Sequence, residues 1–179
     1  MTASNPAIAT AVQRVRSVLK RRPETGLHED APATARWQGG TRVVASHANG
    51  AQVLTDLPSE LGGSGDQVTP GWLFRAGLAA CATTSIVLKA AAEGIELAAL
   101  EVRAGSRSDM RGLLGMNDEA GQPVHADPSD LHMQVRIEVP GEAPDRLRAL
   151  VERAVACSPV PCMVGHANAL ALHIDIAPA

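Results

Sequence analysis

The stretch TPGWLFRAGLAACATTSIVLKAAAEG, residues 69–94, decides the fold. Thr69 is a favoured N-cap residue, and Pro70 suits the first position of a helix. No proline follows before Gly94, a typical residue just past a helix end. Apolar residues surround this helix instead of forming one stripe, which is typical of a buried helix. We therefore predict a long buried helix, and we expect a second subunit to cover what so small a chain leaves exposed.

The flanking segments predict the shorter elements of an α+β protein, with antiparallel sheets around the long central helix. Spacing of apolar residues near 3.6 predicts helices, and alternation or turn residues between apolar runs predict strands. The predicted helices are residues 6–21 and 144–156; the predicted strands are 41–44 and 52–55 around a turn at 49–50, then 95–104, 131–139 and 169–176. Residues 105–128 are expected to be irregular and residues 157–162 to form a turn. Residues 1–30 are expected to be an N-terminal helical extension, and residues 31–179 a single domain.

Composition excludes several classes of protein. The 179 residues are 45% apolar with a net charge of −3, so no basic surface for nucleic acid is expected. With one Phe, two Trp and no Tyr, an aromatic platform for stacking bases is not expected either. No segment reaches the apolar length of a membrane span, and the first residues lack a secretory signal, so we expect a cytoplasmic protein. Three cysteines are an odd number for a disulfide scaffold and point to core, metal-binding or reactive thiols.

Cys81 lies in the middle of the predicted buried helix, where a cysteine is either a small core residue or a reactive thiol. It is about three turns from the helix start, too far for the helix dipole to favour a thiolate, so a reactive Cys81 needs a cation from another segment. The hydroxyls of residues 83–85 favour reactivity, because Thr84 and Ser85 share a helix face with Cys81.

Cys157 and Cys162 bracket the predicted turn after the last helix, and each is either an exposed thiol or a core residue. Together with His166 they have the spacing C-x4-C-x3-H, which makes zinc an alternative. A fourth ligand is not found nearby, so we expect no metal. No phosphate-binding or dinucleotide-binding motif is present, so we expect no cofactor.

Three stretches resemble the OsmC/Ohr family, the osmotically inducible and organic hydroperoxide resistance proteins. They are the helix segment 69–81 with its cysteine, the acidic loop DLPSELGG at 56–63, and Ser-Pro-Val at 158–160. The run 111–116 also resembles a feature of one subgroup. This resemblance covers about residues 33–176 and implies an intertwined α+β homodimer with active thiols near the subunit interface.

The resemblance also implies a thiol-dependent peroxidase that acts on organic hydroperoxides or hydrogen peroxide, with a dithiol as reductant. Cys81 matches the attacking thiol, and Arg42, in the segment 39–42, matches the activating cation. The family's second cysteine aligns with Ser158, so Cys157 is expected to resolve the oxidised Cys81, with Cys162 as the next candidate.

The sequence departs from the family at Gly71, where the peroxidases usually carry a Glu that orients the Arg. This departure favours an alternative: a non-peroxidatic protein of the same fold that binds a small apolar or acyl ligand in the dimer cleft, with Cys81 as a packing residue.

Overall fold

Helix α2 (Pro70–Ala92) is the centre of the fold in the computed structural model, which describes residues 5–166. Its start is as predicted: Pro70 occupies the first turn, and the backbone N–H of Trp72 donates to the Thr69 hydroxyl over 3.2 Å. Its end is also as predicted, because Gly94 follows with a φ of 70°. Within one chain, the buried residues of α2 form a single stripe: Leu78, Ala82, Ile86, Ala90 and Ala91.

The other faces of α2 carry apolar side chains that this chain leaves uncovered. Trp72 is 48% exposed, Phe74 38% and Leu88 44%. By length and composition, α2 could span a membrane. This finding corrects the expectation that no segment reaches the apolar length of a membrane span. It nevertheless packs against α1, α4, α5 and β4, as the central helix of a globular fold does.

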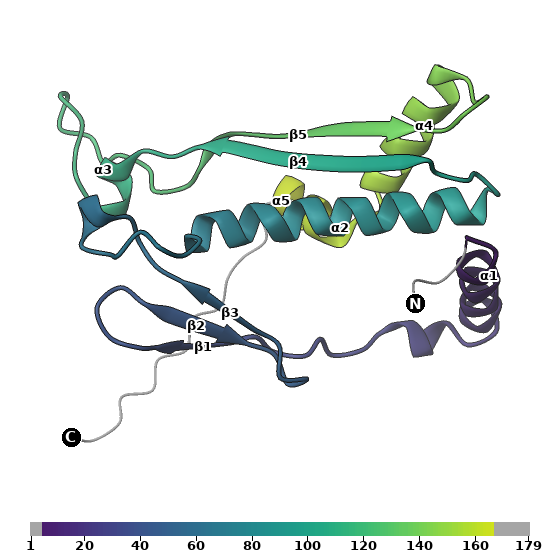
Figure 1. Ribbon diagram of the computed structural model, residues 1–179, viewed down its shortest axis with the longest axis horizontal. Coiled ribbons are helices and arrows are strands. Elements are labelled where there is room, and N and C mark those ends of the chain that lie inside the picture. Colours follow the sequence, from purple (N-terminus) through teal and green to yellow (C-terminus); the bar gives the residue numbers. More distant parts are fainter. Residues whose placement is uncertain (1–4, 167–179) are drawn as a thin grey trace.

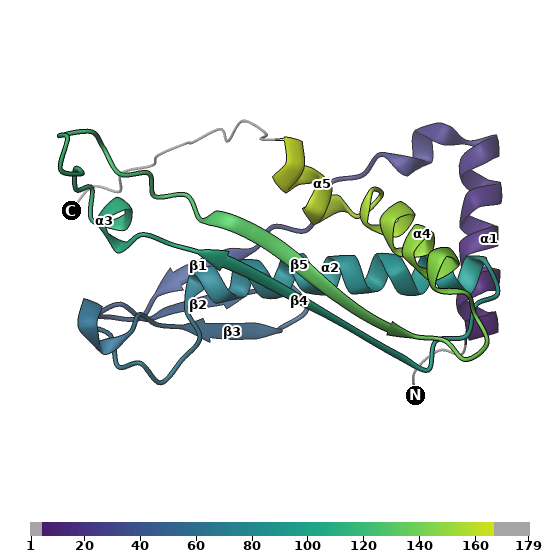
Figure 2. The same ribbon diagram turned by 90° about the horizontal axis from the view of Figure 1, so that it is seen from above.

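Strands β4 (Ala99–Arg107) and β5 (Ser129–Glu138) form an antiparallel pair that lies along one side of α2 (Figures 1 and 2). The alternation predicted for β5 is confirmed, with Leu131, Met133, Val135 and Ile137 on the less exposed face. The predicted start of β4 at residue 95 is wrong. The N–H of Ile95 donates to the Ala90 carbonyl over 2.9 Å, so Ile95 completes the end of α2 and is buried against Leu150. The connection between the two strands contains a short helix, α3 (Met110–Leu113), where irregular structure was expected.

Strands β1 (Thr34–Trp37), β2 (Val43–Ser46) and β3 (Gln52–Thr55) form a second antiparallel sheet, on the other side of α2 (Figure 1). The predicted hairpin turn at 49–50 is confirmed by the bond from His47 N–H to the Ala51 carbonyl, 2.9 Å. Thr41 and Arg42 lie in the β1–β2 turn instead of in a strand, because the Arg42 N–H closes that turn on the Gly39 carbonyl. Among the described residues, this sheet packs extensively only on itself. The α+β class with antiparallel sheets around a central helix is confirmed.

The remaining helices gather around the C-terminal half of α2. Helix α1 (Asn5–Arg21), followed by the 3-10 turn η1 (Pro23–Gly26), crosses the end of α2, while α4 (Pro144–Val155) and α5 (Pro159–His166) lie along its side (Figure 2). Helix α5 corrects the turn predicted at 157–162. Its two prolines fall in the first helical turn, where backbone N–H groups have no partner inside the helix. The strand predicted at 169–176 lies outside the described residues.

Candidate functional site: a thiol facing a buried serine

Cys81 lies midway along α2 and is partly buried, next to the exposed Ala80 and the buried Ala82. The hydroxyls that follow it are used by the helix itself. Thr83 Oγ1 donates to the Ala79 carbonyl over 2.8 Å, and Thr84 Oγ1 donates to the Ala80 carbonyl over 3.0 Å. Because both hydroxyls bond to their own helix, Thr83 and Thr84 give no reason to expect a reactive Cys81.

The partner of Cys81 is instead Ser158, 77 residues further along the chain. The Ser158 hydroxyl donates to Cys81 Sγ over 3.3 Å, and Ser158 is completely buried. Among residues 5–166 this is the one hydrogen bond that reaches the Cys81 sulfur. A buried hydroxyl aimed at a thiol supplies a donor that a thiolate needs in place of water.

Ser158 is fixed in place by the junction between α4 and α5. Its N–H donates to the Val155 carbonyl over 3.0 Å, and its carbonyl accepts from the Cys162 N–H over 2.9 Å. The junction follows from the sequence, since Pro159 prevents α4 from continuing and at the same time begins α5. The hydroxyl is thus positioned by two helix ends.

The other two cysteines lie on the same junction, one on each side of Ser158 in the sequence. Cys157 is exposed, while Cys162 is partly buried and its thiol donates to the Ala156 carbonyl over 3.2 Å. All three thiols are free. Cys81 therefore lies on α2 and the other two thiols lie on the α4–α5 junction, where Ser158 is the residue that contacts Cys81.

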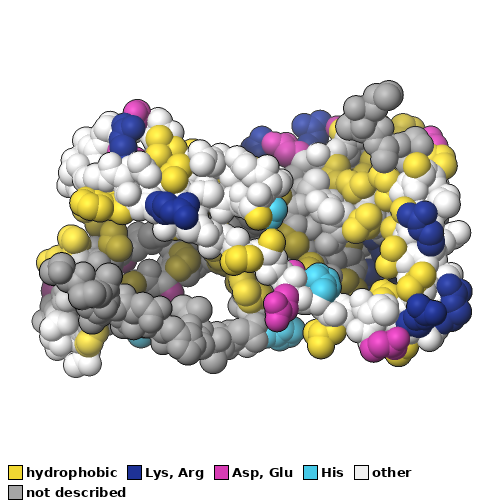
Figure 3. All heavy atoms as spheres, turned by 90° about the horizontal axis from the view of Figure 1, so that it is seen from below, with side chains coloured by type: hydrophobic (Ala, Val, Ile, Leu, Met, Phe, Trp, Pro, Cys, Tyr) yellow, Lys and Arg dark blue, Asp and Glu magenta, His cyan; other side chains and the backbone are white. Residues whose placement is uncertain are grey.

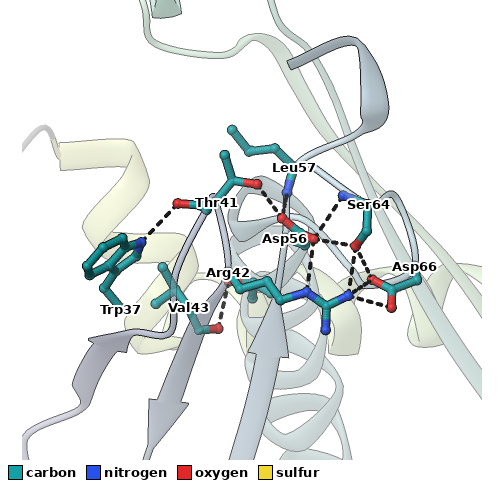
Figure 4. A network of polar contacts seen from close by, with 10 residues as sticks. Trp37, Thr41, Arg42, Val43, Asp56, Leu57, Ser64 and Asp66 are labelled. Atoms are coloured by element: carbon teal, nitrogen blue, oxygen red, sulfur yellow. Dashed lines mark hydrogen bonds and ion pairs between the residues drawn. The ribbon is translucent and has the colours of Figure 1, made fainter. Parts of the chain in front are cut away.

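Arg42 lies in a polar network that joins the β1–β2 turn to the loop before α2 (Figure 4). Its Nη2 donates to the Asp66 carboxylate over 2.7 Å and to the Ser64 hydroxyl over 2.8 Å, and its Nε lies 3.4 Å from Asp56 Oδ2. Two carboxylates therefore neutralise this cation. In one chain the guanidinium donates no hydrogen bond to Cys81 among the described residues.

Asp56 is the buried centre of this network and is only 2% exposed. Its carboxylate accepts from the Ser64 hydroxyl over 2.5 Å, from the Ser64 N–H over 3.1 Å and from the Leu57 N–H over 2.8 Å, and also from Thr41. These donors, Ser64 first, hold the pKa of Asp56 far below its usual range. The network ties the acidic loop, including the 3-10 turn η2 (Ser59–Leu61), to the β sheet.

Comparison with known protein families identifies the family of this chain. The model of the OsmC-like protein family matches residues 63–173, more than half of the chain. The chain belongs to the OsmC-like protein family. This confirms the resemblance found in the sequence, and the matched residues include both Cys81 and Ser158.

Crystal structures of OsmC-like proteins share the fold at low sequence identity. An OsmC-like protein from Mycoplasma pneumoniae is 16% identical with a TM-score of 0.65, over 78% of this chain and 90% of that one. Organic hydroperoxide resistance proteins from Elizabethkingia anophelis and Legionella pneumophila are 23% and 22% identical, each with a TM-score of 0.55. They cover 78% of this chain and 91% and 92% of their own. No protein of curated function matches the chain.

Two features of this OsmC-like chain bear on its chemistry. At Gly71 a Cβ atom would lie 3.6 Å from Arg75 Nη1, in ordinary contact, so the fold itself has room for a larger side chain there. Among residues 5–166, no three His, Cys, Asp or Glu side chains lie close enough together to bind a metal ion. Cys157, Cys162 and His166, which were considered for zinc, are among these residues.

Ser158 is the residue of this candidate site that composition and periodicity did not single out. The only signal in the sequence was the family resemblance, which implies a second cysteine at this position in the peroxidases. In the structure this position faces the sulfur on α2.

Proposed function

We propose that this OsmC-like protein is a thiol-dependent peroxidase in which Cys81 reduces organic hydroperoxides or hydrogen peroxide in defence against oxidative stress. The observation that carries the proposal is the hydrogen bond from the buried Ser158 to Cys81 Sγ. A cysteine that only fills space has no need of a buried donor, and burying an unpaired hydroxyl there would cost free energy. Organic hydroperoxide resistance proteins among the structural neighbours support the same class of substrate.

The proposed chemistry uses two thiols in sequence. The Cys81 thiolate attacks one peroxide oxygen, the O–O bond breaks, and an alcohol (water, from hydrogen peroxide) leaves as Cys81 becomes a sulfenic acid. A second thiol then attacks the sulfur of the sulfenic acid and displaces water, which forms a disulfide. Cys157 is the preferred candidate for this second thiol, and Cys162 is the other candidate. A dithiol reductant restores both thiols by exchange and is itself oxidised. Both candidates flank Ser158, so a small rearrangement of the α4–α5 junction would bring either toward Cys81.

Arg42 is the proposed activating cation, and a homodimer is the proposed setting. Two observations support a partner subunit: α2 exposes Trp72 and Phe74, and the β1–β3 sheet lacks extensive packing within its own chain. An intertwined cytoplasmic homodimer would cover both surfaces and would bring each sheet, with its Arg42, against the other subunit. Light scattering on the purified protein should give a mass near twice 18.6 kDa.

The alternative is a non-peroxidatic OsmC-like protein that binds a small apolar or acyl ligand in the dimer cleft. The specific observation in its favour is the pairing of Arg42 with Asp56 and Asp66, together with Gly71 in place of the family's Glu. In that case Cys81→Ser would leave ligand affinity unchanged.

Reaction of the reduced protein with one equivalent of cumene hydroperoxide tests the proposal. Mass spectrometry should show a disulfide between Cys81 and Cys157 or Cys162, and Cys81→Ser should abolish peroxide consumption. In Cys157→Ser/Cys162→Ser, a sulfenic acid at Cys81 should accumulate and react with dimedone. If all three thiols stay free after exposure to hydroperoxide, the protein is not a peroxidase of this kind.

A further inference from the structure

Helices α1, α2 and α4 border an open apolar groove at the end of the molecule away from the β1–β2 turn. We name it the α1 groove; its volume is about 490 Å³. It is lined by residues Ala11, Val12, Val15, Arg16, Ser85, Leu88, Lys89, Arg153, Ala154 and Cys157. Figure 3 shows apolar side chains gathered at the α1 end, with Lys and Arg side chains at their margin. Cys81 does not line the groove, and α1 lies outside the residues matched to the family, although Cys157, the proposed resolving thiol, is one of the lining residues.

The charged side chains of the α1 groove are all cations. Lys89 Nζ lies 3.7 Å from Glu93 Oε1, and Arg153 Nη2 lies 3.1 Å from the same oxygen, so one carboxylate is shared by two cations. Arg16 makes no ion pair among residues 5–166. Three positive charges facing one negative charge leave the rim with an excess of two.

We propose that the α1 groove binds an amphipathic anion with a single aliphatic chain, such as a fatty acid. Val12, Val15 and Leu88 offer an apolar surface to the chain, and Val15 and Leu88 are 52% and 44% exposed without it. Arg16 and Arg153 offer donors to the carboxylate, for which a guanidinium is well shaped. The groove has the size of ordinary small-molecule sites, about 300–1,000 Å³.

Charge argues for this ligand over a second copy of the chain. A two-fold interface through the α1 groove would bring the same patch of both copies together, each with its excess of positive charge at the rim. Two rims that carry the same excess charge repel each other when they are brought together out of water. An anion instead complements the excess positive charge.

Titration calorimetry with dodecanoate, below its micelle concentration and with the full chain, tests the proposal. Dodecanoate should bind one site per chain, dodecanol more weakly, and dodecyltrimethylammonium not measurably. Arg16→Gln/Arg153→Gln should weaken dodecanoate binding about tenfold, the expected effect of two exposed charges, and leave dodecanol unchanged. Arg14→Gln is the matched control: it removes an exposed arginine from the same helix outside the groove and should change neither ligand.

Cys157 supplies a second readout, because it is exposed and lines the groove. Saturating dodecanoate should slow its alkylation by iodoacetamide at least fivefold, and should leave Cys162 unaffected. The proposal is overturned if dodecanoate fails to bind, if Arg14→Gln weakens it as much as the double variant, or if Cys157 is not protected. It is equally overturned if the double variant changes the mass measured by light scattering, since the groove would then be an interface between copies. None of these results depends on peroxidase activity at Cys81.

Discussion

Replacing Ser158 by cysteine should create a disulfide with Cys81, because the serine hydroxyl already points at that sulfur. The two atoms are 3.3 Å apart, and an S–S bond of about 2.05 Å requires them to approach by only about 1.3 Å. With diamide as oxidant, the two thiols lose two protons and two electrons and form the bond. The variant also places a cysteine where the family resemblance implies the second cysteine of the peroxidases.

The expected gain in stability follows from the length of chain that the bond closes. The two residues are separated by 77 positions. Loop-closure entropy for such a loop amounts to about 15 cal/mol/K, or about 4.5 kcal/mol at 25 °C, and strain from a buried bond lowers this to about 2–4 kcal/mol. This gain is the difference in free energy of unfolding between the oxidised and the reduced forms of the same variant, so the effect of the substitution itself cancels.

Urea unfolding of Ser158→Cys, made in a Cys157→Ser/Cys162→Ser background, measures this difference with and without a phosphine reductant. The oxidised form should unfold at higher urea, and its mass should be 2 Da below that of the reduced form, as loss of two hydrogens requires. The same background with Ser158→Ala is the control and should respond to neither oxidant nor reductant. Failure to form the bond would show that Ser158 does not face Cys81. A bond that forms without a rise in the unfolding midpoint would contradict the stability gain expected from loop closure.

Three further outcomes follow from the loop before α2 and from the start of α2. Gly63→Ala should lower the free energy of unfolding in urea by about 2–3 kcal/mol, because the new Cβ would lie 1.8 Å from the Leu57 carbonyl oxygen and at least two loop hydrogen bonds must break. Gly77→Ala is the contrasting variant. It has open space for a Cβ within helix α2 and should raise the free energy of unfolding by about 0.5–1 kcal/mol. Stability should fall as the pH drops below about 4, the usual pKa of a carboxyl in an unfolded chain, because the pKa of Asp56 is lower in the folded state. Asp56→Asn should flatten that dependence in acid titrations followed by circular dichroism; an unchanged slope would contradict the role given to the network. Gly71→Glu should stabilise α2 by about 1 kcal/mol through helix propensity, the helix dipole and a pair with Arg75, whereas Gly71→Gln should keep only the first part in thermal unfolding.

Local patterns predicted the elements whose causes are local. The start of α2 was predictable because a Thr cap and a following Pro act within one turn, and β5 was predictable because alternation reflects one covered face. The start of β4 was predicted wrongly because Ile95 is apolar whether it caps a helix or joins a strand. Its bond to the Ala90 carbonyl decides between the two, and that bond depends on how the chain turns after Gly94.

The sequence by itself determined the family, the central helix and the identity of the three thiols. Only the tertiary structure decided that Cys81 meets Ser158, that Cys162 lies on a helix, and that Arg42 is held by two carboxylates. The physical reason is range: helix caps, periodicity and turns depend on neighbours a few residues apart, whereas the donor to a sulfur is supplied by whichever residue the packing of distant helices brings within about 3 Å.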